Sequence, residues 1–158
     1  MRDQDQEKNL VEGDLTVAKK FIVGSLENCD LPALGINELN VRVDTGAKTS
    51  SLHVDQIRKI MKAGKPWVAF AIHPNIHKVD DWIHCEAPLR DIRKIKSSNG
   101  VAEERYIIRT TISLNEQVWE IDISLTDRSD MSYLMLLGRE GMGNRLLVDP
   151  SKSYLLSG

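Results

Sequence analysis

The sequence has few of the residues that mark secreted, redox-active or membrane-spanning proteins. Its two cysteines, Cys29 and Cys85, lie far apart and outside any CxxC spacing, so we expect reduced thiols and no disulfide framework. No apolar run is long enough to cross a bilayer. The opening residues MRDQDQEKNLVEGD lack the apolar segment of a secretory signal, which predicts a cytoplasmic location.

An excess of basic charge is also missing. The chain has 21 Lys and Arg against 23 Asp and Glu, a formal net charge of -2. This balance removes the usual electrostatic reason to expect a nucleic acid, so we expect no direct nucleic-acid partner and no membrane partner. The 158 residues are 41% hydrophobic and 28% charged, as in one soluble domain. We expect a polar, flexible arm over residues 1–17 and a single domain over 18–158.

Short apolar runs separated by turn residues predict a mostly β fold. In the run 118–125, Trp119, Ile121 and Ile123 alternate with polar residues, a period of two that is typical of a half-buried strand. Asn115-Glu116 and Asn99-Gly100 are turn signals between such runs. The predicted strands cover residues 20–26, 38–43, 67–72, 106–114, 118–125 and 133–137.

Helix is predicted in only two places. Residues 54–63 could form two or three turns that stop at Gly64. A second short helix is expected over 139–146, although Gly141 and Gly143 weaken it.

The strongest local signal for chemistry is Asp44-Thr45-Gly46, which follows the apolar run at 41–43. An acid at a strand end is aimed into a cleft, a threonine can hold the loop by hydrogen bonds, and a glycine lets two backbones approach closely. Alone, this triplet often marks only a turn. Much further along the chain, an apolar run at 134–137 breaks at Gly138-Arg139 into the expected short helix.

Together these two segments resemble the retropepsin-type aspartic proteases. The longer pattern, VDTGAKTSSLH at 43–53, SNG at 98–100, LLGR at 136–139 and VDP at 148–150, is similar to the bacterial ATP-dependent zinc protease family. The resemblance implies a retropepsin-like fold, a closed or partly open β-barrel with one or two short helices. It also implies an association with ATP-grasp ligases that add glutamates to a ribosomal protein.

The chemistry of aspartic proteolysis then implies a homodimer. Two carboxylates about 3 Å apart must share one proton. This chain has a single Asp-Thr-Gly, so a two-fold axis would have to bring two copies of Asp44 together. The resemblance assigns catalysis to Asp44, Thr45 and Gly46, and makes the hairpin around Asn99-Gly100 a flap over the substrate. The expected substrate-binding residues are Ala47, Lys48, Ser98, Asn99, Gly100 and Arg139.

Two departures from the viral enzymes bear on the substrate. Lys48 stands where those enzymes carry an acid that pairs with the Arg of the Gly-Arg motif. Lys48 and Arg139 would therefore repel one another unless Glu140, Asp130 or a bound anion lies between them, and a positive rim favours an acidic peptide. Together with the association with glutamate ligases that the resemblance implies, this rim leads us to expect hydrolysis of peptide or isopeptide-like bonds in glutamate-rich tails of a ribosomal or other cytosolic protein. The second departure, extra length before the flap, predicts an inserted helix or hairpin around 54–85.

Two other functions stay open. His73 and His77, with His84 or Cys85, could bind zinc in a hydrolase, although no Glu lies between the first two and Pro74 interrupts a helix there. We therefore expect no metal and no cofactor, and since no GxxxxGK[ST] or GxGxxG occurs, any ATP dependence would come from a partner. The other alternative is a non-catalytic β-rich module for peptide binding or dimerisation.

Overall fold

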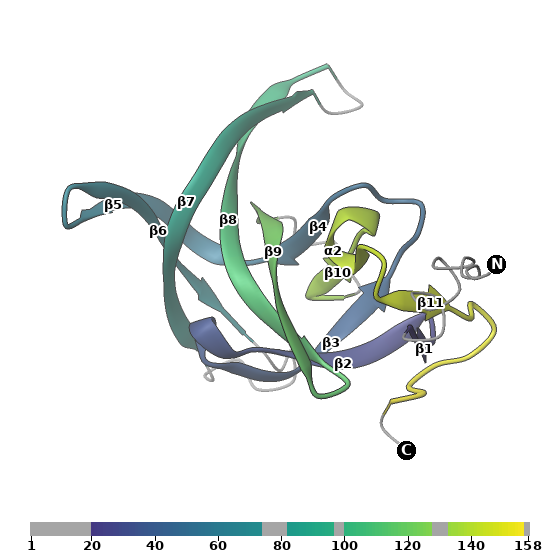
Figure 1. The fold of residues 1–158 in the computed structure, drawn as a ribbon. Coiled ribbons are helices and arrows are strands. Elements are labelled where there is room, and N and C mark those ends of the chain that lie inside the picture. Colours follow the sequence, from purple (N-terminus) through teal and green to yellow (C-terminus); the bar gives the residue numbers. More distant parts are fainter. Residues whose placement is uncertain (1–19, 74–81, 97–99, 128–132, 157–158) are drawn as a thin grey trace, which may run out of the picture.

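The computed structural model describes residues 20–73, 82–96, 100–127 and 133–156, and these form a β-barrel with two short helices (Figure 1). The predicted arm at 1–17 lies outside the described residues. The elements are β1 (Phe21–Val23), β2 (Leu26–Leu31), the 3-10 helix η2 (Pro32–Leu34), β3 (Ile36–Val43), β4 (Ser50–His53), β5 (Asp55–Lys62), β6 (Lys65–Ile72), β7 (Ile83–Lys96), β8 (Ala102–Leu114), β9 (Gln117–Thr126), β10 (Met135–Leu137), α2 (Arg139–Met142) and β11 (Leu146–Val148).

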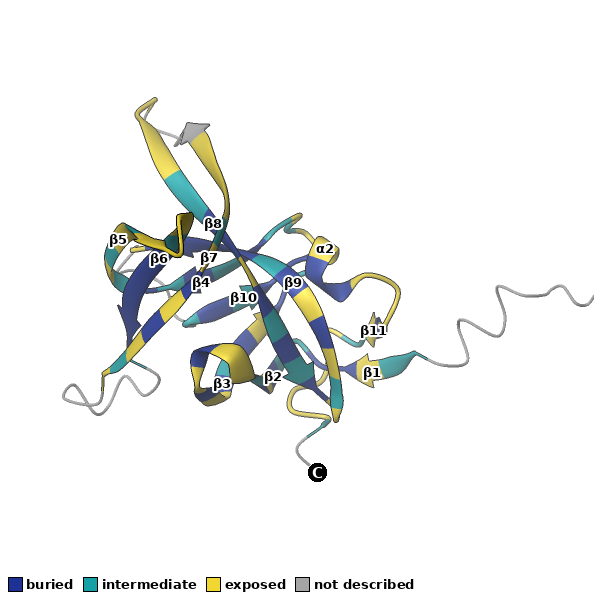
Figure 2. Ribbon diagram, turned by 60° about the vertical axis from the view of Figure 1, so that its left-hand side comes forward, coloured by how far each residue is buried: buried dark blue, intermediate teal, exposed yellow. Residues whose placement is uncertain are grey.

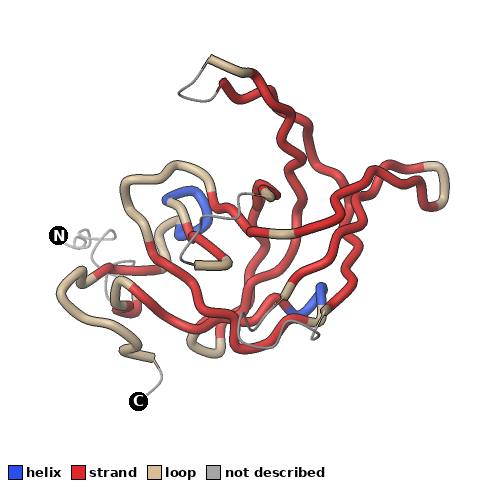
Figure 3. Tube along the Cα trace, turned by 180° about the vertical axis from the view of Figure 1, so that it is seen from behind, coloured by secondary structure: helices blue, strands red, loops and turns tan. Residues whose placement is uncertain are grey.

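Six strands close the barrel in the order β2-β3-β10-β4-β9-β8, because β2 also pairs with β8 through Asp30 and Ser113. Strands β7, β6 and β5 continue outward from β8 (Figure 1). Strands β1 and β11 form a separate parallel pair. The tube in Figure 3 shows how strongly strands dominate. The prediction of a mostly β, retropepsin-like barrel is confirmed.

The barrel core follows the period-two pattern seen in the sequence. On β9, Trp119, Ile121 and Ile123 are buried while Glu120 is exposed. Alternation of this kind puts one side of each strand against the core and the other toward solvent. The Trp119 Nε1 also donates a 2.8 Å hydrogen bond to the Gly141 carbonyl, which fastens α2 onto β9.

Two hairpins turn through pairs of residues with positive φ. Asn115 and Glu116 have φ of 53° and 62° between β8 and β9, which confirms the turn predicted there. Ala63 and Gly64 have φ of 53° and 77° between β5 and β6. Two left-handed residues in succession match the right-handed twist of the flanking strands, so both loops form tight hairpins.

The helix predicted over 54–63 is wrong, because those residues contain strand β5. Gly64 is the second residue of a hairpin turn and does not stop a helix. Ile57 and Ile60 are only half-buried and Met61 is 62% exposed, so no apolar helix face has a core to cover. The inserted hairpin, the other expectation for 54–85, is confirmed as β5–β6.

Two further predicted elements are shortened or divided in the structure. The helix expected over 139–146 ends at Met142, because Gly143 leaves the helical conformation and β11 begins at Leu146. The strand expected over 20–26 is broken at Gly24, where the chain passes from β1 to β2. The two strands pair with different neighbours: β1 pairs with β11, and β2 pairs with β3 and β8.

Within the described segments, no helix has the length and apolarity needed to cross a bilayer.

Candidate active site

Strand β3 delivers Asp44 to one end of the barrel. Val41 and Val43 are buried and pair with Met135 and Leu137 of β10 in parallel register. The Asp44 amide then donates to the Leu137 carbonyl at 3.0 Å, so the strand pairing continues one residue past β3. Asp44 is half-buried at this point. The acid predicted to lie at a strand end is therefore anchored there by its own backbone.

The loop after Asp44 is organised around its carboxylate. Asp44 Oδ1 accepts a 2.9 Å hydrogen bond from the Gly46 amide, and the Ala47 amide donates to the Asp44 carbonyl at 3.3 Å. A side-chain oxygen that binds the backbone two residues on is a common way to fix a tight turn. Among the described residues, Asp44 Oδ2 has no hydrogen-bond partner. One oxygen is thus held in place and the other is available to a ligand.

The Gly-Arg junction predicted from the sequence is packed directly against this loop. The amides of Arg139 and Glu140 donate to the carbonyls of Ala47 and Lys48, at 2.8 and 3.0 Å. The Arg139 guanidinium donates to the Thr45 carbonyl at 2.9 Å. Segments far apart in the sequence are therefore joined through main-chain groups, as the resemblance implied.

Gly138 shows how tightly the two segments meet. A Cβ at this position would lie 2.7 Å from the Thr49 carbonyl carbon and 3.0 Å from the Ala47 oxygen. Its amide donates to the buried Ser50 Oγ at 3.0 Å. Only glycine fits there without moving the backbone. The sequence reasoning did not identify Ser50 as a residue that positions this junction. Its place in the longer pattern VDTGAKTSSLH at 43–53 is the signal that could have indicated it.

The positive rim expected from Lys48 and Arg139 is present in part. Both residues are exposed, but the guanidinium of Arg139 is engaged by the Thr45 carbonyl. Lys48 has no ion pair with any described residue. Asp130, one of the acids considered as a bridge, lies outside the described residues. Lys48 is therefore the more available of the two cations.

The predicted flap corresponds to the hairpin of β7 and β8. The strands pair from Leu89 and Ile108 out to Lys96 and Ala102, and the hairpin projects from the barrel (Figure 2). Gly100 is exposed with φ of 85°. Ser98 and Asn99 lie outside the described residues. The hairpin is confirmed, and its contact with substrate stays a prediction.

Within the part of the chain that the structure describes, the residues considered for zinc do not come together as a metal site. His73 packs on the Trp82 ring with centroids 3.4 Å apart, and His77 lies outside the described residues. The Cys85 thiol is directed to the Leu34 carbonyl, and burial raises its pKa to about 11, so it does not supply a thiolate at neutral pH. Across residues 20–73, 82–96, 100–127 and 133–156, no three His, Cys, Asp or Glu side chains gather as metal ligands would.

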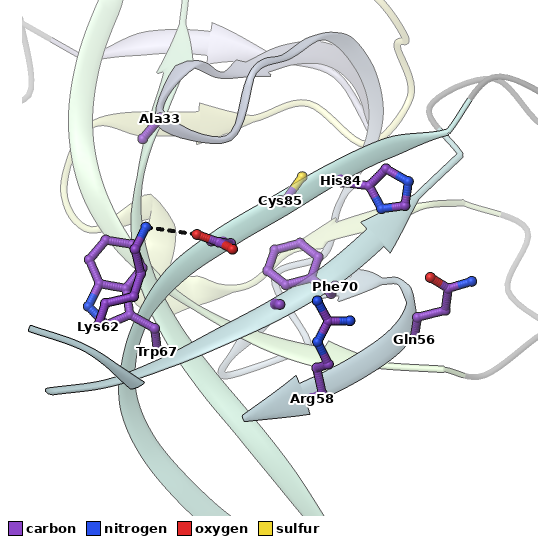
Figure 4. A pocket seen from close by; sticks show the side chains of 10 residues that line it. Ala33, Gln56, Arg58, Lys62, Trp67, Phe70, His84 and Cys85 are labelled. Carbon is purple, nitrogen blue, oxygen red and sulfur yellow. Dashed lines mark hydrogen bonds and ion pairs between the residues drawn. The ribbon is translucent and has the colours of Figure 1, made fainter. Parts of the chain in front are cut away.

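A pocket of about 430 Å³ lies away from Asp44, on the strands that extend from the barrel. Figure 4 shows Arg58 and His84 at one end of it and Lys62, close to Trp67, at the other. Lys62 Nζ forms a 2.7 Å ion pair with Glu86 and lies 4.4 Å from the centre of the Trp67 ring. Ala33, just before β3, also lines this pocket, whereas Asp44 directly follows β3. The two sites lie at opposite ends of that strand.

The comparisons with known proteins agree with this geometry. The family described as "RimB-like: Retropepsin-like aspartic endopeptidase RimB" matches residues 22–157. A protein of unknown function from Legionella pneumophila, Lpg0085 (DUF785), has a similar crystal structure, with a TM-score of 0.72 and 29% identity. That likeness covers 85% of this chain and 97% of the Legionella chain.

Longer proteins also contain a similar segment. A protein of Shewanella pealeana named "Probable alpha-L-glutamate ligase" is 49% identical over 137 residues, which are 87% of this chain and 30% of that protein. A protein of the same name from Parasynechococcus marenigrum is 42% identical over 140 residues, 89% of this chain and 30% of that protein. The chain thus spans about 30% of the length of these curated relatives.

Proposed function

This chain belongs to the RimB-like family of retropepsin-like aspartic endopeptidases, and from that premise we propose that it hydrolyses peptide or isopeptide-like amide bonds. The supporting observation is the Asp44 loop. One carboxylate oxygen is fixed by the Gly46 amide at 2.9 Å, and the other has no partner among the described residues. The amides of Arg139 and Glu140 hold the loop by hydrogen bonds to the carbonyls of Ala47 and Lys48. A positioned acid with one available oxygen is what activation of water requires.

In the proposed reaction, Asp44 acts with the Asp44 of a second chain. One carboxylate takes a proton from water while the water oxygen forms a bond to the amide carbon. The other carboxyl, which holds the shared proton, donates it as the carbonyl becomes tetrahedral. The first carboxyl then passes the proton it took from water to the amide nitrogen, and the C–N bond breaks so that the amine leaves. A hydroxyl proton of the tetrahedral carbon returns to the second carboxylate, and the carbon becomes a carboxylic acid.

The requirement for a second chain follows from the residue count. The chain has one Asp-Thr-Gly, and an isologous two-fold interface places identical residues opposite one another. Two carboxylates held that close cannot both ionise at neutral pH, so one keeps a proton. In this proposal each Thr45 braces the loop of the partner, and Gly46 leaves room for the approach.

An acidic substrate is the second part of the proposal. The curated relatives that contain a segment like this chain are named probable glutamate ligases, which supports a glutamate-bearing substrate. Lys48 is exposed beside the Asp44 loop and has no ion pair with a described residue. We place Ala47, Lys48 and Arg139 beside the bound peptide, and the β7–β8 hairpin with Ser98, Asn99 and Gly100 above it. The product would be a glutamate-rich tail shortened on a ribosomal or other cytosolic protein.

The direct test is Asp44→Asn, which keeps the hydrogen-bonding shape but removes the base. We expect hydrolysis of glutamate-containing peptides to fall on the order of 1,000-fold or more, with unchanged sedimentation and thermal unfolding. Glu116→Gln, at an exposed acid in the β8–β9 turn, is the control and should retain activity. Full activity in Asp44→Asn would refute the mechanism.

Mixing the two chains tests the shared site. If each site needs one Asp44 from each chain, a large excess of the Asp44→Asn chain should extinguish the activity of the wild-type chains by forming mixed dimers. Activity that stays proportional to the wild-type chain, or a strictly monomeric active species in sedimentation, would show that one chain is sufficient.

A further inference from the structure

A second charged residue, Arg42, lies on the strand that delivers Asp44. Its neighbours Val41 and Val43 point into the core, and Arg42 is exposed. Side chains two residues apart on a strand project from the same face, with Cα atoms about 6.6 Å apart. Because the Asp44 amide continues the pairing with β10, this alternation extends to Asp44. Arg42 and Asp44 therefore project from the same face of the sheet.

Half-buried side chains of the neighbouring strands lie beside Arg42. Leu26 of β2 and Leu136 of β10 are its paired neighbours, and Ser51 of β4 is the next residue in the same row. Leu26, Leu136 and Ser51 are all half-buried. Paired residues of neighbouring strands share one face, so these side chains form a continuous strip next to Asp44. An extended peptide lying on this strip would bring the side chain of a residue near its reacting bond to Arg42.

The guanidinium of Arg42 is positioned but not neutralised. Its Cζ lies 5.6 Å from the centre of the Tyr133 ring, a cation–π contact that limits its rotamers. No acidic side chain among the described residues forms an ion pair with it. Other arginines do have such partners, as in Arg93–Asp91, Arg105–Glu103 and Arg109–Asp122. Arg42 therefore has donors available for an external anion.

We propose that Arg42 is a specificity-determining residue that binds the carboxylate side chain of a glutamate next to the scissile bond. This rests on the proposed function, since it places the peptide against Asp44. A guanidinium matches a carboxylate with two parallel hydrogen bonds, which the single ammonium of Lys48 cannot do. Arg139 is engaged by the Thr45 carbonyl. Arg42 is thus the cation near Asp44 with both an ordered side chain and an available planar fork.

The test separates binding from hydrolysis by using the Asp44→Asn chain. Two labelled peptides are compared by fluorescence anisotropy, one of alternating glutamate and alanine and one with glutamine in place of each glutamate. In the Asp44→Asn background, Arg42→Gln should weaken binding of the glutamate peptide about 10-fold or more, because a charge-assisted contact is lost. Binding of the glutamine peptide should change less than about 2-fold.

Two further variants make the result specific. Arg58→Gln removes another exposed arginine, in the distant pocket, and should leave both affinities within about 2-fold. Arg42→Glu should reverse the preference, so that a lysine–alanine peptide binds better than the glutamate peptide. An unchanged thermal unfolding midpoint for each variant shows that the fold is intact.

The outcomes distinguish this inference from the proposed function. Equal weakening of both peptides by Arg42→Gln, or an equal loss in Arg58→Gln, overturns the role of Arg42. If the otherwise wild-type chain cleaves neither peptide while Arg42 still discriminates glutamate in binding, the hydrolase proposal fails and the role of Arg42 stands. Cleavage of both peptides with the same kcat/KM in wild-type and Arg42→Gln chains leaves the hydrolase and refutes this inference.

Discussion

The Asp44 loop and the β5–β6 hairpin are built in opposite ways. The loop is held by main-chain hydrogen bonds from the Gly138-Arg139 junction, and Gly138 has no space for an added methyl group. In the hairpin, β6 is mostly buried, whereas β5 has no buried residue and half of its eight residues are charged. Residues 55–96 contain nine basic and five acidic residues, against twelve and eighteen in the rest of the chain. A site that positions a reacting atom depends on backbone geometry, whereas a charged surface depends on composition and tolerates change.

The sharpest way to test this contrast is to add one methyl group in each region. Gly138→Ala would place a Cβ 2.7 Å from backbone atoms of Thr49, so we expect a loss of about 3 kcal/mol in unfolding free energy and no hydrolysis. Gly64→Ala has open space around it and pays only for its positive φ, about 1 kcal/mol. Chemical denaturation and peptide hydrolysis measure both. Full activity in Gly138→Ala would show that the loop can shift without cost.

A smaller effect is expected from a hydroxyl that supports the loop. Ser50→Ala removes the acceptor of the Gly138 amide and leaves a buried N–H unpaired, which should cost about 1–3 kcal/mol and lower kcat. Ser124 is a matched control on β9. Its Oγ is buried and has no partner among the described residues, so Ser124→Ala should be neutral or stabilising. Equal losses in the two variants would mean that the Ser50 hydrogen bond contributes nothing particular.

The smallest effect is expected from the ion pair that joins Lys62 of the β5–β6 hairpin to Glu86 of β7. Lys62 and Glu86 are 46% and 45% exposed, so Lys62→Met should cost about 0.5 kcal/mol, less at high salt, with hydrolysis unchanged. A double-mutant cycle with Glu86→Gln measures the coupling. A large loss of activity in Lys62→Met would contradict the comparison and make the hairpin part of the catalytic machinery.

The features predicted well from the sequence are those with a local cause. Alternation on β9 and the Asn115-Glu116 turn are local patterns, and both appear in the structure as expected. The Gly138-Arg139 junction beside Asp44 was predicted from resemblance, because no local property of either segment implies contact with the other. The structure shows the contact as two main-chain hydrogen bonds from Arg139 and Glu140.

The features that sequence reasoning missed depend on tertiary pairing. Strand β5 reads as a short helix because Ile57, Ile60 and Met61 recur at helical spacing before Gly64, and only its pairing with β6 fixes it as a strand. Strands β4, β7 and β11 were not predicted. Strands β4 and β11 are only four and three residues long, whereas β7 does alternate over residues 83–90, a signal that was overlooked. Arg42 was overlooked because its surroundings are formed by Leu26 of β2 and Leu136 of β10. The sequence alone does not show that these residues lie beside it.

Glu27 of β2 connects the far end of the chain to the site strand. Its carboxylate is fully buried and accepts hydrogen bonds from the amides of Gly24, Leu155 and Leu156. Ser25 follows Gly24, and its carbonyl accepts a hydrogen bond from the amide of Val43. Val43 is the residue immediately before Asp44. A chain truncated after Tyr154 would lack the Leu155 and Leu156 amides. The buried carboxylate of Glu27 would then keep only the Gly24 amide as a hydrogen-bond donor. The amides of Leu155 and Leu156 thus stabilise a buried anion, and their loss would disturb β2 and, through Ser25 and Val43, the start of the Asp44 loop.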